Sequence, residues 1–78
     1  MDQARLSTVT LSARDYALGH TFASLQLAQQ DVRLVSLRRS NGVVVTMGEV
    51  LVLAVGDILV LSGKPEALAL AEKKLARG

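Results

Sequence analysis

Short apolar runs alternate with glycine and polar turns along the chain, and the clearest run lies near the C-terminus. There Gly56-Asp57 precedes a largely apolar run over 58–62, which Gly63 ends. This order predicts a turn, a strand and another turn. Because apolar residues occupy consecutive positions, both faces of the strand are expected to be apolar. A domain of this size has material to cover one face, so another copy or another domain is expected to cover the second.

Two segments in the first half of the chain carry different patterns. Residues 5–12 are rich in β-branched side chains, which predicts the first strand. Thr21 is a suitable N-cap, so a short helix is predicted over 22–28. At 3.6 residues per turn, the inward stripe of that helix would be Leu18, Phe22 and Leu25, with Leu27 off the stripe.

The middle of the chain predicts a hairpin. Asn41-Gly42 separates two apolar runs, and both residues tolerate positive φ. The second strand is therefore predicted over 32–39 and the third over 43–46, antiparallel to it. Strict alternation along the second strand would place Leu34 and Arg38 on one face and Arg33, Val35, Leu37 and Arg39 on the other.

The last segment predicts a helix. Pro65 suits the first helical position, and Glu66 suits the positive end of the helix dipole. Its apolar stripe would be Ala67, Leu68, Ala71 and Leu75, with Leu70 outside it. Residues 47–49 are expected to turn the chain, and residues 50–55 to form an extended or loosely turned apolar connection.

The predicted element order is thus β-α-β-β-(β)-β-α. It indicates an α+β fold in which two helices pack on one face of a small, mostly antiparallel sheet. The whole chain, 1–78, is expected to be a single domain, with residues 1–3 as an added start or a disordered end.

Composition narrows the classes of function. A chain of 78 residues buries a small core, so its stability as an isolated domain is marginal. It has no cysteine and one histidine, so it is expected to hold no disulfide, metal or cofactor. Oligomerisation or attachment to a larger protein remains. A net charge of +2, one Tyr and one Phe argue against a nucleic-acid partner. No apolar run reaches the roughly 18 residues that would insert in a membrane.

No set of residues suggests an enzyme. Ser62-Gly63-Lys64 lacks the earlier glycine and the following Ser or Thr of a phosphate-binding loop. His20 has no nucleophile elbow beside it, so we expect a capping or surface residue. Asp57 is expected to accept backbone N–H bonds in its turn.

The arginines of the second strand allow two interpretations. Arg33, Arg38 and Arg39 are either solvated charges at the strand ends or contacts to a phosphate or carboxylate in a cleft at a subunit interface. Residue types alone leave both open.

A resemblance to a known family is carried by residues 18–25, by residues 32–39, and by residues 56–63 with the following Lys64-Pro65-Glu66. With these segments the chain resembles the TrkA-C domain, the C-terminal domain of the regulator-of-potassium-conductance family. The resemblance covers about residues 5–76 and is greatest to the version attached to monovalent cation:proton antiporters and potassium efflux systems. It implies a homodimeric regulatory domain on the cytoplasmic side of the cell membrane. The implied partners are a parent membrane transporter and an adjacent Rossmann-type domain.

The resemblance also implies candidate site residues. Some family members bind a small, nucleotide-like ligand at the dimer interface, and the matching positions are Asp31, Val32, Arg33 and Leu34. The family often has a proline-containing stretch where this chain has 47–49, so a ligand contact from that loop is not expected. The candidate interface residues on the sheet and the last helix are Val43, Val45, Leu59, Leu61 and Leu70. A purely structural dimerisation module that binds no ligand is the alternative.

Overall fold

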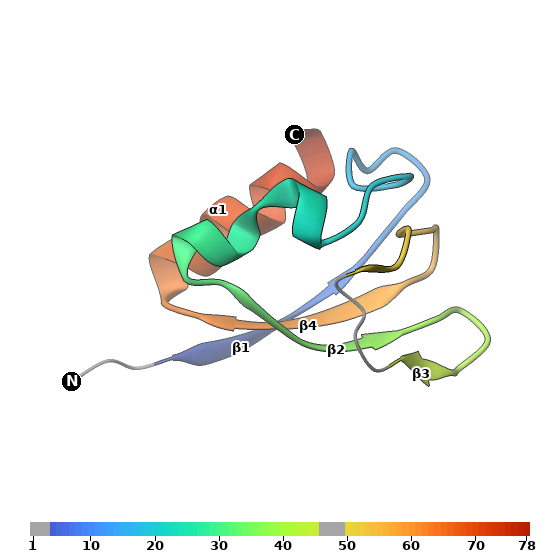
Figure 1. Cartoon of the computed structure of the whole chain (residues 1–78), viewed down its shortest axis with the longest axis horizontal. Coiled ribbons are helices and arrows are strands. Elements are labelled where there is room, and N and C mark those ends of the chain that lie inside the picture. The colour runs from blue at the N-terminus through green and yellow to red at the C-terminus, as the bar shows by residue number, and fades with distance from the viewer. Residues whose placement is uncertain (1–3, 46–49) are drawn as a thin grey trace.

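The computed structural model describes residues 4–45 and 50–78. Its elements are β1 (Arg5–Thr10), the 3-10 turns η1 (Ala23–Leu25) and η2 (Leu27–Gln30), β2 (Arg33–Arg38), β3 (Val44–Val45), β4 (Ile58–Gly63) and α1 (Pro65–Arg77). The strands form one antiparallel sheet in the order β1-β4-β2-β3. Helix α1 and the 3-10 turns lie on the same side of this sheet (Figure 1), which confirms the α+β fold. The predictions for residues 1–3 and 46–49 lie outside the described residues.

The predicted helix over 22–28 is replaced by the two 3-10 turns. Gln26, between them, is left-handed with φ 59°. Leu25 and Leu27 are both buried, although a continuous α-helix would turn them about 200° apart. The left-handed residue lets both side chains reach the core. The N-cap of η1 is Phe22 and not the predicted Thr21, although Thr21 Oγ1 accepts a hydrogen bond from Ser24 N at 3.1 Å just before the turn.

The face assignment predicted for the second strand is wrong, because β2 contains a bulge. Its register against β4 shifts between Leu34 and Ser36. Leu34 pairs with Leu61, and Leu37 pairs with Leu59, so both leucines face the same side despite their odd spacing. Strict alternation would have sent one of them away from the core.

The hairpin between β2 and β3 is confirmed, with a longer turn than the Asn-Gly pair alone requires. Arg39 N donates to Val43 O at 2.8 Å, so three residues form the loop. Gly42 has φ 89°, whereas Asn41 instead accepts a hydrogen bond from Val43 N through Oδ1 at 3.0 Å. This is the pattern of a hairpin with one left-handed glycine before the returning strand.

Helix α1 covers the inner side of the sheet. Its buried residues Leu68, Ala71 and Leu75 face the core as predicted, and Leu70 is exposed. Ser7 Oγ of β1 donates to Glu72 Oε2 at 2.6 Å, which fixes the side of the sheet that faces the helix. The core is completed by residues of the sheet, the 3-10 turns and the loops: Leu11, Ala17, Phe22, Leu25, Leu27, Val32, Leu37, Leu53, Leu59 and Leu61.

The other side of the sheet, called here the outer face, is not covered by α1 or the 3-10 turns (Figure 1). Residues paired across antiparallel strands point the same way, so the register defines this face from the partners of Ile58, Val60 and Ser62. Its members are Leu6, Thr8, Thr10, Arg33, Ser36, Arg38, Val44, Ile58, Val60 and Ser62. The chain thus covers one face of β4, as the sequence predicts, and leaves Ile58 and Val60 half-buried on the other.

Candidate functional site

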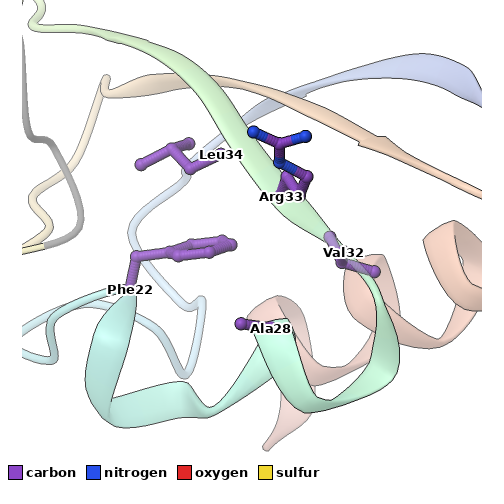
Figure 2. A pocket seen from close by; sticks show the side chains of 5 residues that line it. All are labelled: Phe22, Ala28, Val32, Arg33 and Leu34. Carbon is purple, nitrogen blue, oxygen red and sulfur yellow. The ribbon is translucent and has the colours of Figure 1, made fainter.

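A hollow opens where the 3-10 turns meet the start of β2. It measures about 240 Å³ and is lined by Phe22, Ala28, Val32, Arg33 and Leu34. Figure 2 shows the side chain of Arg33 pointing away from Phe22 and Ala28, beside an otherwise apolar wall. The hollow therefore offers an apolar floor with one cation at its rim.

The chain builds this hollow with a sharp reversal before β2. Asp31 is left-handed with φ 63°, and its N–H donates to Ala28 O at 3.1 Å. Val32 N donates to Leu27 O at 3.2 Å, and the Val32 side chain is fully buried. Gly63 passes so close that a Cβ there would lie 3.1 Å from Asp31 O. The reversal at Asp31 and Val32 therefore fixes the position of Arg33 at the start of β2.

A second hollow also borders Arg33. It measures about 350 Å³ and is lined by Arg33, Leu34, Val35 and Ser62. Among the described residues, neither lining includes a carboxylate. Arg33 is exposed and lines both hollows, so both suit a ligand that combines an anionic group with an apolar or planar part.

The structure brings together three of the four residues predicted to bind a ligand. Val32, Arg33 and Leu34 line the first hollow, whereas Asp31 shapes the turn and does not line it. Phe22 and Ala28 were not predicted. Ligand binding by these residues stays a prediction.

The predicted interface residues fall in different environments. Leu59 and Leu61 are fully buried by the chain's own atoms, so they are unavailable to a partner. Val45 is half-buried against the core, and Val43 and Leu70 are more than half exposed. Strand alternation alone could not distinguish the inner face of β4 from its outer face.

A group of exposed valines was not recognised in the sequence. Five of the nine exposed large apolar residues in the described chain belong to it, and we name them the valine patch: Val43, Val44, Val50, Val52 and Val55. Val43 and Val44 belong to the hairpin, and Val50, Val52 and Val55 belong to the segment 50–57. The two segments lie at the same end of the molecule (Figure 1). The signal was present in residues 50–55, an apolar stretch without the polar alternation of a half-buried strand.

Hydrogen bonds hold the two parts of this end together. Arg39 Nη2 donates to Val52 O at 3.1 Å, and Arg39 Nη1 donates to Asp57 Oδ2 at 3.0 Å. The same Asp57 oxygen accepts from Ala54 N at 2.9 Å, as expected for a turn carboxylate. Thr21 forms an isolated bridge with Val52. The patch is therefore displayed on a loop that is anchored to the sheet.

His20, the one histidine considered for catalysis, makes its contacts with Tyr16. Its Nδ1 lies 3.0 Å from Tyr16 O, and its ring stacks on Tyr16 at a centroid distance of 4.6 Å. Within residues 4–45 and 50–78, no group of three metal-ligating side chains is found. Nor is any helix in those ranges long and apolar enough to cross a membrane.

These features define a small α+β domain. One face of its sheet is not covered by helix α1 or the 3-10 turns, Arg33 lines two hollows, and one end exposes several valines. The family model of the TrkA-C domain matches residues 6–76, and the chain belongs to the TrkA-C domain family. TrkA-C is a family of regulatory, non-catalytic domains of potassium transport systems. A search of curated proteins found no match.

Proposed function

We propose that this chain is a regulatory and dimerisation domain of a monovalent cation transporter or antiporter, on the cytoplasmic side of the cell membrane. An adjacent Rossmann-type domain would link it to the parent transporter. Membership of the TrkA-C family supports the regulatory role in potassium transport. The single structural observation that supports the dimer is the valine patch, because five of the nine exposed large apolar residues of the described chain lie in two segments at one end of a small domain.

We choose the residues of the proposed interface by the solvent exposure of their side chains. It contains Val43 from the residues expected in the sequence, with Val45 at its border, and adds the rest of the valine patch. At about 25 cal/mol per Å², burying several valines would stabilise a pair of copies by several kcal/mol before the cost of association. Leu70, on the solvent side of α1, stays a separate prediction for a second contact.

The proposed ligand is small and anionic, of nucleotide type, and it would sit against Arg33. Val32 and Leu34 would contact its apolar or planar part, and Asp31 would hold the corner in place. Such a ligand regulates a transporter only if it prefers one arrangement of the two copies, because equal affinity for both shifts nothing.

Thermal unfolding with a panel of nucleotides, cyclic dinucleotides and monovalent cations tests the ligand. A ligand present at about 100 times its Kd stabilises the folded state by about 2.7 kcal/mol, which raises the Tm. The rise should disappear in Arg33→Gln and persist in Arg14→Gln, an exposed arginine away from the hollows. A flat panel would instead favour the purely structural dimerisation module.

A further inference from the structure

The outer face carries positive charge that nothing in the described chain neutralises. Arg33 and Arg38 are both exposed on it, and no ion pair to either is found in residues 4–45 and 50–78. None of its described members is an Asp or a Glu. Arg39, one residue further along, is by contrast paired with Asp57 on the inner side.

The two arginines are spaced along a half-buried apolar row. Arg33 pairs with Ser62 and Arg38 pairs with Ile58, so they stand four positions apart along β4. At about 3.3 Å per residue, the backbone positions are separated by roughly 13 Å. Val60 lies between these positions, and it is half-buried, as is Ile58.

A second copy of the chain does not fit this face. If two outer faces packed against each other, Arg33 and Arg38 of both copies would lie in one interface. The described residues of this face include no carboxylate that could pair with them, whatever the orientation of the two copies. Like charges facing one another across a contact cost several kcal/mol, so this pairing is disfavoured. The valine patch meets this face only at Val44, which pairs with Arg38, and its other four members are not among the described residues of the outer face.

Other polyanions fit less well. Single-stranded nucleic acid needs aromatic side chains for stacking, and the described outer face has none. Anionic membranes are recognised by clusters of several basic residues, and this face presents two. A protein segment is the class that uses both the arginines and the apolar row.

We infer that the outer face binds an acidic, amphipathic segment of a partner protein, whose carboxylates pair with Arg33 and Arg38 and whose apolar side chains cover Ile58 and Val60. A helix laid along the sheet would need two acidic residues seven or eight positions apart, because these positions share one helix face and lie roughly 10–12 Å apart, close enough for long side chains to span the roughly 13 Å between the arginines. Arginine pairs well with carboxylates because its planar fork can donate two parallel hydrogen bonds. This inference goes beyond the regulatory and dimerisation role and does not rest on it.

Selection from a randomised helical peptide library against the full chain tests the inference. The selected peptides should carry two acidic residues about two turns apart, and binding should shift the backbone amide NMR signals of Thr8, Ile58 and Val60. Arg38→Glu should weaken binding at least about tenfold, since it replaces an attractive charge pair with two like charges. Arg14→Glu makes the same change of charge on an exposed loop and should leave the affinity unchanged.

Arg38 also separates this test from the ligand test, because it lines neither hollow. Arg38→Gln, with its fold checked by NMR, serves if the charge reversal unfolds the domain. The inference is overturned if the selected peptides lack acidic residues, map only elsewhere, or bind Arg38→Glu equally well. Binding of phosphatidylserine vesicles or of a single-stranded oligonucleotide through Arg38, without peptide binding, would also overturn it.

Discussion

Arg39 Nη1 donates a hydrogen bond to Oδ2 of Asp57 at 3.0 Å, and the Asp57 side chain is only 1% exposed. The two residues are far apart in the sequence, and their pairing joins the end of β2 to the turn before β4. Because Arg39 also binds Val52 O, the ion pair fixes the loop that displays part of the valine patch. The ion pair therefore helps to hold the proposed dimer surface, together with the Ala54–Asp57 hydrogen bond and the Thr21–Val52 bridge.

Removing the buried carboxylate should destabilise the domain. Asp57→Ala leaves Arg39 and the N–H of Ala54 without their shared acceptor, so the free energy of unfolding should fall by about 2–3 kcal/mol. Asp15→Ala is the matched control, because Asp15 accepts a hydrogen bond from Ser12 N in an exposed turn. It should cost about 1 kcal/mol or less. Urea unfolding measures both, and equal losses would show that the Arg39–Asp57 contact contributes nothing special.

Two left-handed glycines should respond differently to alanine. Gly42 and Gly56 have φ of 89° and 88°, so alanine strains the backbone at both by roughly 1 kcal/mol. A Cβ at Gly42 meets open space, whereas at Gly56 it would lie 2.8 Å from Ser40 Cβ. Gly56→Ala should therefore lower the Tm more than Gly42→Ala.

A second substitution isolates the clash at Gly56. Ser40→Gly removes the Cβ that a new methyl group would meet, so it should recover part of the loss in Gly56→Ala. The same substitution should not rescue Gly42→Ala. Equal Tm losses for the two alanine variants, without rescue, would contradict the close approach of these loops.

The bulge in β2 predicts an unusual tolerance to deletion. Removing Val35 leaves Leu34 and Leu37 two positions apart, so both can still face α1 in a regular strand. Removing Val60 from β4, which pairs regularly with β1, would send Leu59 or Leu61 out of the core. Circular dichroism and urea unfolding should show a folded Val35 deletion. The Val60 deletion should lose at least about 2–5 kcal/mol, as for a lost core leucine. The reverse order would contradict the register.

Burial should separate the effects of replacing two leucines, Leu6 in β1 and Leu11 just after it. Leu11 is 1% exposed and Leu6 is 68% exposed. Leu11→Ala should lower the free energy of unfolding by about 2–5 kcal/mol, because it leaves a cavity in the core. Leu6→Ala should cost less than about 1 kcal/mol. Similar losses for both in urea unfolding would mean that the outer face is already covered in the isolated chain.

The elements that the sequence predicted depend on local chemistry. Pro65 at the helix start, Gly42 in the hairpin and Asp57 in its turn each act within a few residues, so their roles could be predicted from spacing. The apolar stripe of α1 follows from periodicity alone and was also correct.

The features that were missed depend on contacts between distant segments. The bulge at Val35 exists because β4 requires both Leu34 and Leu37 on one side, which β2 alone does not reveal. Gln26 turns left-handed because Leu25 and Leu27 must both reach the core. The candidate site was found only in part, because Phe22 and Ala28 come from a separate segment and residue patterns do not show solvent exposure.

The oligomeric state of the chain tests the central claim most directly. Sedimentation equilibrium across a range of protein concentrations should give twice the monomer mass for the unmodified chain. Val43→Asp with Val52→Asp should give a folded monomer, while Val35→Asp, an equally exposed valine outside the patch, should remain dimeric. A monomer at every concentration, or a dimer indifferent to the paired substitutions, would contradict a regulatory domain that assembles through the valine patch.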